Sequence, residues 1–217
     1  MDGNRRWAEQ HGLPQLEGHR RGYQVVKKLG NWCIDRGIEV LTVYAFSTEN
    51  WNRSKTEVKY LMNLFELAML REVDDLHRKN IRLAVIGRVK DLPKRLQNRI
   101  AAAAAKTKHN TRGTLQLAIN YGGRAEIVDA MRKVVRSARD SSKITEKSIS
   151  EAMYTAHQPD PDMIIRTSGE QRLSGFLAWQ GVYSELYFTE KFWPDFNEKE
   201  LDKALAEYTR RQRRFGK

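Results

Sequence analysis

Short runs of β-branched and aromatic residues alternate with longer segments of helical periodicity, and this alternation constrains the fold more than any other feature of the chain. The runs predict buried strands over 38–46, 81–86, 114–119 and 163–165. The periodic segments predict helices over 19–36, 55–79, 93–109, 124–139, 144–156 and 197–214. Strands that alternate with helices form parallel βαβ units. We therefore expect an α/β fold with a mostly parallel central sheet flanked by helices.

The length of 217 residues suits one α/β domain over 1–217, with 40% hydrophobic and 30% charged residues as in a globular chain. No stretch approaches the roughly 18–20 apolar residues of a membrane span. The first six residues do not begin a signal peptide. A single cysteine, Cys33, cannot form an internal disulfide. These features favour a soluble protein of the cytoplasm.

The formal net charge is +12, from 39 basic and 27 acidic residues. Such an excess suits an anionic partner, which can be nucleic acid, a membrane surface or a phosphorylated small molecule, and a solvated basic surface explains it equally well. A nucleic-acid-binding protein would add a basic stripe with stacking aromatics or a known binding motif. The sequence contains neither pattern, so we expect no nucleic-acid partner.

Polar segments follow three of the predicted strands, over 47–53, 120–123 and 166–174. Ligands of parallel α/β sheets bind beyond the carboxyl ends of the strands. We therefore expect these three segments to meet at one shared rim.

The segment 166–174 combines two arginines, two serines and a glycine directly after a strand. Arginine offers a planar fork of donors to phosphate oxygens, glycine lets the backbone approach closely, and serine adds a hydroxyl. The composition predicts a phosphate-binding loop, and an ordinary polar loop is the alternative.

Two further segments carry candidate site residues. Asp2 beside Gly3 can hold Mg²⁺, which prefers one or two carboxylates with water and substrate phosphates, although Asp-Gly is also a common turn. In the segment 45–53 a strand runs into polar side chains and Trp51. The alternative there is a strand-to-helix loop with Trp51 packed beneath it.

Five motifs occur in order along almost the whole chain: MDGNRRWA from Met1, GHRRG over 18–22, YAFSTENWNR over 44–53, NYGGR over 120–124, and RTSGEQRLS through WQGVYSELYF over 166–188. Together they resemble the undecaprenyl diphosphate synthase family of cis-prenyltransferases. The resemblance implies that family's fold and an Mg²⁺-dependent isoprenyl transferase. Its substrates would be isopentenyl diphosphate and an allylic diphosphate of the farnesyl or geranylgeranyl type.

The resemblance also implies roles for individual residues. Asp2 would be the catalytic Mg²⁺ carboxylate, Glu185 would complete the metal site (in trans across a dimer in some family members), and Asn50 would help to remove the proton. The remaining residues would bind substrate: Gly3, Asn4, Arg5, Arg6, Trp7 and His19 around the allylic diphosphate; Ser47, Thr48, Glu49, Trp51 and Arg53 in the motif over 44–53; Arg166, Arg172 and Ser174 around isopentenyl diphosphate.

Family members form homodimers, and the terminal segment 214–216 resembles one that reaches the neighbouring site. A lipid product would bring the enzyme to the membrane periphery. The apolar strand that family members carry before the aspartate is missing here. Either the start of the sequence is misassigned or trimmed, or the protein manages without this strand, which would loosen Asp2 and weaken metal binding. The alternative is a non-catalytic subunit of a heteromeric enzyme. Such subunits typically lose the early aspartate and the arginines, which this chain keeps as Asp2, Arg166 and Arg172.

The long helix after Ser54 carries an apolar stripe at helical spacing. Its members are Val58, Leu61, Met62, Phe65, Ala68, Met69, Val73 and Leu76. A growing isoprenoid tail needs an apolar tunnel, and the resemblance makes this stripe the candidate wall, with Ala45 as a small residue that leaves room. Ordinary core packing is the alternative.

Overall fold

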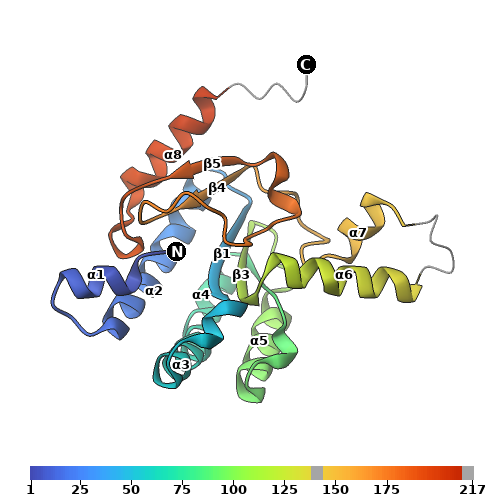
Figure 1. Ribbon diagram of the computed structural model, residues 1–217, viewed down its shortest axis with the longest axis horizontal. Helices are drawn as coiled ribbons and strands as arrows, with labels where there is room; N and C mark the ends of the chain where they lie inside the picture. Colours follow the sequence, from blue (N-terminus) through green and yellow to red (C-terminus); the bar gives the residue numbers. More distant parts are fainter. Residues whose placement is uncertain (138–143, 212–217) are drawn as a thin grey trace. The chain divides into compact units, whose positions relative to one another are not determined.

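A computed structural model describes residues 1–137 and 144–211. The chain divides into two compact units, which we call unit 1 (1–32, 160–173 and from 180 onward) and unit 2 (33–159 and 174–179). Figure 1 shows the course of the chain through both units. The assignment of 1–217 to a single domain stays a prediction. The predicted helix ends beyond residues 137 and 211, and the segment 214–216, lie outside the described residues.

Unit 2 contains a parallel three-stranded sheet in the order β1 (Val40–Ser47), β3 (Gly113–Tyr121), β2 (Ile81–Ile86). The parallel pairing confirms the predicted sheet. Because Ser47 and Tyr121 are paired in register, the segments that follow β1 and β3 leave the sheet at the same carboxyl edge. The rim predicted for these two segments is therefore confirmed.

Among the described residues of unit 2, five α-helices follow these strands: α3 (Lys55–Arg71), α4 (Val73–Arg78), α5 (Lys94–Thr107), α6 (Gly123–Ser137) and α7 (Glu146–Ala152). Helices α4 and α5 pack against β2, α3 packs against α5, and α6 packs against α7. The flanking helices confirm the predicted α/β class.

The long helix predicted over 55–79 is two helices, which is a correction. Its start is as predicted, because the Ser54 hydroxyl accepts a hydrogen bond from the Glu57 N–H at 3.3 Å. The helix ends at Arg71, and α4 begins after Glu72. Asp74 and Asp75 lie in the first turn of α4, where negative charge stabilises a helix N-terminus. These acidic residues favour a new helix start at this point.

The apolar stripe of α3 packs in the core of unit 2. Leu61, Met62 and Met69 are buried. They share one cluster with Phe46, Leu83, Leu92, Leu96, Ile100, Ala103 and Ile119, against which Ala45, Val58, Phe65, Val73 and Leu76 also pack. Burying a side chain of this size contributes about 1.5–3 kcal/mol. The stripe therefore anchors α3, and its use as a tunnel wall stays a prediction.

Unit 1 contains a two-stranded parallel sheet of β4 (Met163–Arg166) and β5 (Glu185–Phe188), with helices α1 (Asn4–Gln10) and α8 (Glu198–Arg210). Strand β5 was not predicted, because its four residues are all partly buried and give no alternating pattern. The described strands thus form two sheets. The segment 166–174 follows a strand of the second sheet, so the expectation of one sheet carrying all three polar segments is corrected.

Helix α2 (Gln15–Asp35) begins in unit 1, where α1 packs closely against it. A Cβ atom placed on Gly18 would lie 1.9 Å from the Asn4 carbonyl oxygen, and one on Gly22 would lie 2.3 Å from Asn4 Oδ1. Two glycines one helical turn apart therefore let the start of α1 approach the backbone of α2. The same helix carries Gly30, where an added Cβ would meet nothing within 4 Å.

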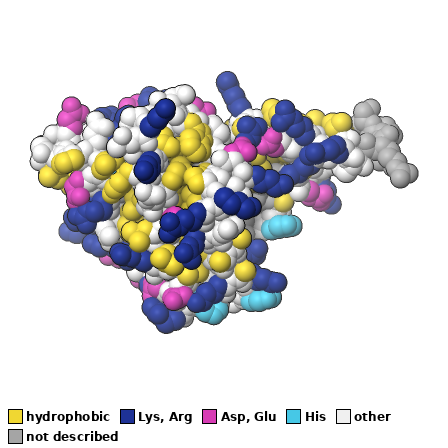
Figure 2. Space-filling view, turned by 90° about the horizontal axis from the view of Figure 1, so that it is seen from below, with side chains coloured by type: hydrophobic (Ala, Val, Ile, Leu, Met, Phe, Trp, Pro, Cys, Tyr) yellow, Lys and Arg dark blue, Asp and Glu magenta, His cyan; other side chains and the backbone are white. Residues whose placement is uncertain are grey.

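No helix within residues 1–137 and 144–211 is both long enough and apolar enough to cross a bilayer. Figure 2 shows Lys and Arg side chains spread over one face of the molecule, with apolar and acidic side chains among them. On this face the basic excess does not gather into one stripe.

Candidate active site

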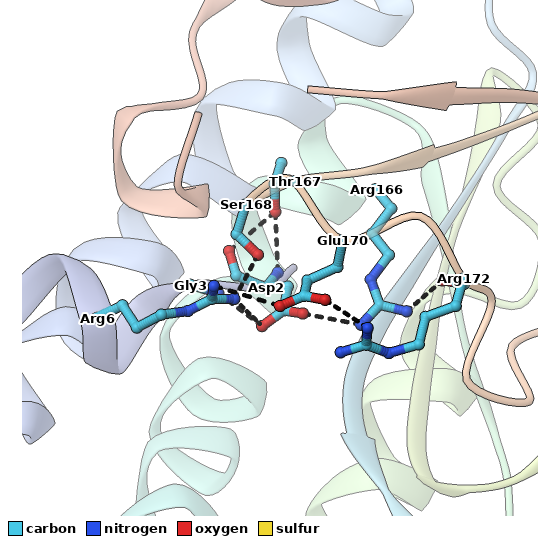
Figure 3. A network of polar contacts seen from close by, with 8 residues as sticks. All are labelled: Asp2, Gly3, Arg6, Arg166, Thr167, Ser168, Glu170 and Arg172. Carbon is cyan, nitrogen blue, oxygen red and sulfur yellow. Dashed lines mark hydrogen bonds and ion pairs between the residues drawn. The ribbon is translucent and has the colours of Figure 1, made fainter. Parts of the chain in front are cut away.

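Asp2 and Arg166 are brought together in unit 1, although 163 residues lie between them in the sequence. Arg166 ends β4, and its Nη2 atom lies 2.9 Å from Asp2 Oδ2. The other carboxylate oxygen accepts a hydrogen bond from the Gly3 N–H at 2.8 Å and lies 3.6 Å from Arg6 Nη2. Arg6 comes from the first turns of α1. Figure 3 shows both arginines directed toward Asp2 from opposite sides.

Glu170 joins the remaining arginines to this group. Its carboxylate pairs with Arg6, at 3.3 Å from Nη1, and with the guanidinium of Arg172. Arg6 also donates a hydrogen bond of 2.7 Å to the Ser168 hydroxyl, and Arg166 donates to the Arg172 carbonyl. We call the set Asp2, Arg6, Arg166, Ser168, Glu170 and Arg172 the Asp2 cluster.

The backbone of Asp2 is fixed by hydrogen bonds, so the alternative of a loosened Asp2 is not what the structure shows. Its N–H donates to the Thr167 hydroxyl at 2.9 Å. Its carbonyl accepts from the same hydroxyl at 2.9 Å and from the Trp193 N–H at 2.9 Å. Gly3 follows with φ 96°, and a Cβ there would lie 2.5 Å from a Phe192 ring carbon. The motif thus needs a glycine after the aspartate.

The charges of the Asp2 cluster keep its aspartate ionised. Burial acts to raise the pKa of Asp2, but the hydrogen bond and charge of Arg166, with the Gly3 N–H, outweigh burial and lower the pKa. An ionised, partly exposed carboxylate fits Mg²⁺, which takes most of its ligands from water and phosphate. Among the described residues there is no group of three or more His, Cys, Asp or Glu side chains that could hold a metal. A bound Mg²⁺ would therefore depend on phosphate oxygens beside Asp2.

Glu185 lies at the start of β5, where its Oε2 atom accepts a hydrogen bond of 2.7 Å from Arg211. Arg211 also donates to the Leu186 carbonyl at 2.9 Å and pairs with Glu207 at 3.1 Å. The structure thus places Glu185 in an ion-pair group at the end of α8. Its role as a second metal ligand stays a prediction.

The other predicted residues of unit 1 lie around α1 and α2. Trp7 is buried, donates from Nε1 to Asp195 Oδ1 at 2.8 Å and stacks on His11. His19 is buried on α2, and Arg5 is exposed on α1. Asn4 places its Oδ1 atom against Gly22, with no hydrogen-bond partner among the described residues. Their contacts with substrate stay predictions.

In unit 2 the predicted residues 47–53 form a short 3₁₀ turn, η1 (Thr48–Asn52), after β1. Asn50 closes the turn by accepting a hydrogen bond from the Ser47 N–H at 3.0 Å. Thr48 donates its hydroxyl to Glu49 at 2.9 Å. Burial acts to raise the pKa of Glu49, but hydrogen bonds from its own N–H and from the hydroxyls of Thr48 and Ser47 lower it. The turn thus holds an ionised carboxylate.

Trp51 and Arg53 end the same turn. The Trp51 indole is 40% exposed, and its Nε1–H donates a hydrogen bond of 2.7 Å to Asn120 Oδ1. Arg53 donates to Glu57 of α3 at 2.9 Å. The alternative in which Trp51 is packed beneath the loop is therefore not what the structure shows. Ser174 also belongs to unit 2 and has a left-handed backbone, with φ 50°.

A cavity of about 410 Å³ opens in unit 2 beside Trp51. Two stripe residues of α3, Val58 and Met62, line it together with Leu96 of α5. Arg53, Lys55, Lys59, Asn63, Glu66 and Pro93 complete the lining. Part of the α3 stripe thus borders free space, while the rest is core.

The sequence did not indicate a role for Thr167 or Glu170, and Ser168 entered only as one of the two serines of the predicted phosphate-binding loop at 166–174. A carboxylate between arginines was the available signal for Glu170. Asn120 was also missed, because its contact with Trp51 depends on the pairing of β1 with β3.

Comparison with known proteins identifies the family of this chain. The family model described as "Putative undecaprenyl diphosphate synthase" matches residues 1–216. An isoprenyl transferase of Thermotoga maritima is 46% identical over the whole chain and 94% of its own length. A farnesyl-diphosphate-specific ditrans,polycis-undecaprenyl-diphosphate synthase of Micrococcus luteus is 46% identical over the whole chain and 88% of its own length. The chain belongs to the undecaprenyl diphosphate synthase family.

A solved structure agrees with this assignment. The lavandulyl diphosphate synthase of Lavandula x intermedia, in complex with dimethylallyl diphosphate, superposes with a TM-score of 0.96 and 38% identity. The match covers 100% of this chain and 95% of the other. The predicted family and its fold are therefore confirmed.

Proposed function

We propose that this protein is a cis-prenyltransferase that condenses isopentenyl diphosphate with an allylic isoprenyl diphosphate, in an Mg²⁺-dependent reaction that yields a polyprenyl diphosphate. The observation that carries the proposal is the Asp2 cluster. Arg6, Arg166 and Arg172 bring their guanidinium groups to one carboxylate pair, Asp2 and Glu170. Arginines in this arrangement suit phosphate oxygens, and the ionised Asp2 suits the cation that accompanies a diphosphate.

The arginines would act on the diphosphate groups. When the allylic carbon–oxygen bond breaks, negative charge develops on the departing diphosphate, and guanidinium groups already held in place stabilise this charge without reorganising. Arg6 and Arg166 are fixed by Ser168 and Asp2, so they meet this condition. Asp2 would hold Mg²⁺, which when bound adds positive charge beside the leaving oxygens.

The second half of the reaction joins the two substrates. The alkene of isopentenyl diphosphate attacks the allylic cation, forms the new carbon–carbon bond and then loses a proton. The Asn50 carboxamide is too weak a base to keep this proton, and its Oδ1 atom accepts from the Ser47 N–H. We therefore infer that Asn50 orients the substrates and that the departing diphosphate or water accepts the proton.

The test is incubation of the purified chain with labelled isopentenyl diphosphate, Mg²⁺ and a series of allylic diphosphates, followed by chromatography of the products. We expect labelled polyprenyl diphosphates with Mg²⁺ and none after chelation. Product without added metal would contradict the Mg²⁺ requirement. No incorporation with any primer would contradict the activity and would favour the non-catalytic subunit instead.

We also propose a homodimer, as the family resemblance implies, with membrane contact limited to the periphery. Unit 1 exposes two adjacent large apolar side chains, Val182 and Tyr183, at 68% and 81% of their full area. Exposed apolar side chains of this kind are often covered in an interface. Sedimentation equilibrium of the chain, and of a Tyr183→Asp variant, tests the dimer. A monomeric wild-type chain at micromolar concentration would contradict it.

A further inference from the structure

Trp51 is held by a side chain outside its own motif. Its indole N–H donates to Asn120 Oδ1 at 2.7 Å, and its ring meets Phe46 edge to face with centroids 5.2 Å apart. Trp51 is 40% exposed, whereas Asn120 is only 4% exposed. An exposed indole thus takes its orientation from a buried amide.

Asn120 is itself fixed through both its backbone and its side chain. It lies near the end of β3 with φ 52°, a left-handed conformation that asparagine adopts more readily than most residues. Its Nδ2 atom donates to the Arg88 carbonyl at 3.0 Å, and its own carbonyl accepts from the Arg88 N–H at 3.0 Å. Hence both ends of the amide are used, one toward Arg88 and one toward Trp51.

The segment at Arg88 is also fixed. Gly87 has φ 120°, and a Cβ there would lie 2.2 Å from the Ile119 carbonyl, so only glycine allows this close approach to β3. The Arg88 guanidinium forms a bidentate pair with Asp129, at 2.8 and 3.1 Å. Asp129 accepts a further hydrogen bond of 2.5 Å from the Tyr154 hydroxyl. We call Asn120, Arg88, Asp129 and Tyr154 the Trp51 anchor.

We propose that Asn120 is a positioning residue for the condensation reaction, acting through the Trp51 indole. The inference rests on the proposed function for its effect on turnover, but the orientation of Trp51 can be measured without turnover. The hydrogen bond fixes the ring that borders the cavity beside α3 and would present it in one orientation to bound substrate. Loss of that bond would leave the ring free to turn about its side-chain torsions.

The test uses Asn120→Gly, because glycine keeps the left-handed backbone and removes the amide. The matched control is Asn80→Gly. Asn80 has φ 58° and also uses its side chain, which bonds the hydroxyl and the N–H of Thr111 at 3.1 and 3.0 Å. The control makes the same change at a similar backbone conformation, in the turn between α4 and β2.

The first readout is the ¹⁹F spectrum of protein labelled with 5-fluorotryptophan. The chain has five tryptophans, and Trp51→Phe identifies the resonance of Trp51. We expect Asn120→Gly to shift or broaden that resonance and to leave the others in place, whereas Asn80→Gly moves none of them. An unmoved Trp51 resonance in a folded Asn120→Gly variant would overturn the proposal.

The second readout is a double-mutant cycle on kcat/KM. Loss of one hydrogen bond predicts a fall of about three- to tenfold for Asn120→Gly and for Trp51→Phe, and no further fall when the two are combined. Asn80→Gly should leave kcat/KM unchanged. Falls that multiply in the double variant would show that Asn120 does not act through Trp51. If the wild-type chain does not turn over, the proposed function fails, and the ¹⁹F spectrum alone decides the positioning role.

Discussion

In unit 1 the Asp2 cluster is built from long charged side chains, several of which keep much of their area in solvent, whereas in unit 2 the Trp51 anchor is built around one buried amide. Arg6 and Arg172 are 44% and 61% exposed as side chains, and Asn120 is 4% exposed. Arg6 and Arg172 can exchange a carboxylate partner for a phosphate at small cost, because exposed ion pairs are weak. The amide of unit 2 has no such exchange available.

This difference indicates that the two regions have different roles in the proposed reaction. The arginines of the Asp2 cluster pair with Asp2 and Glu170, which orients their guanidinium groups. The anchor of unit 2 holds one aromatic ring in one orientation. Substitutions in the first region should therefore change binding and chemistry, and those in the second should change geometry and stability.

The largest effect is expected from Asp2→Asn. The variant keeps an oxygen that can accept from the Gly3 N–H but loses the charge that would hold Mg²⁺, so turnover should fall by about a hundred- to a thousandfold. Steady-state turnover at saturating Mg²⁺ measures the change, with an unchanged melting curve as the check on folding. The control is Glu9→Gln, an exposed carboxylate on α1, the helix that begins just after Asp2 and Gly3. Near-normal turnover of Asp2→Asn would contradict the proposed role of Asp2 in holding Mg²⁺.

The next effect is expected from Arg172→Ala. This arginine pairs with Glu170 and is largely exposed, so its loss should raise the KM for isopentenyl diphosphate about ten- to a hundredfold. Arg166→Ala should do more, because Arg166 also holds Asp2. Arg210→Ala is the control, since Arg210 is an exposed arginine of unit 1 paired with Glu207. A rise confined to the KM of the allylic substrate would mean that the two diphosphate sites are reversed.

The Trp51 anchor should make the free energy of unfolding depend on pH. Hydrogen bonding by Arg88, and then by Tyr154, lowers the pKa of Asp129 from 3.8 to about 2. A carboxyl group whose pKa is lower in the folded than in the unfolded chain stabilises the fold at pH values above its unfolded pKa. This contribution is therefore complete above about pH 4 and is lost as the pH falls toward 2. Because Asp129 is partly exposed to solvent, we expect its contribution to the free energy of unfolding to be only about 1–2 kcal/mol.

Urea unfolding of wild-type chain and Asp129→Asn between pH 2 and 7 measures this contribution, because the difference between the two curves isolates one carboxyl group. The difference should be largest near neutral pH and should shrink below about pH 4. A difference that does not depend on pH would show that the Asp129–Arg88 pair does not stabilise the anchor.

The smallest effect on total turnover is expected from Ala68→Leu and Ala45→Leu. If the α3 stripe lines the tunnel, either change should shorten the products while the first condensations proceed. If the stripe is only core, overpacking should lower stability by about 1–3 kcal/mol and reduce all products together. Product chromatography beside a melting curve distinguishes the two. Stable variants with unchanged product length would show that the α3 stripe is ordinary core and does not line the tunnel.

Much of the fold of unit 2 could be predicted from the sequence, because its strands are apolar runs and its helices carry clear periodicity. Strand β2 has the predicted bounds, and Ser54 caps α3 as predicted. The break at Glu72 was missed because the apolar stripe continues across it, although Asp74 and Asp75 were a local signal for a new helix start. The short strand β5 of unit 1 could not be predicted, since its four partly buried residues give no alternating pattern.

The site was predictable to the extent that motifs carry it. Asp2 and Arg166 were chosen for their chemistry, and the structure brings them together. Thr167 and Asn120 were not chosen, because a threonine that holds a backbone and an asparagine that orients an indole are defined only by three-dimensional contacts.

The glycines of α2 have a consequence for protein engineering. A designer who wished to stabilise this helix would replace Gly18, Gly22 and Gly30 by alanine, since each change favours a helix by about 1 kcal/mol. Only Gly30 has open space around it; methyl groups at the other two positions would collide with Asn4. Because Arg6 follows Asn4 by two residues, those methyl groups would push aside the helix that delivers an arginine to Asp2. A thermostability screen that accepts Gly30→Ala should therefore exclude the other two positions, where higher helix propensity would be gained at the expense of catalysis.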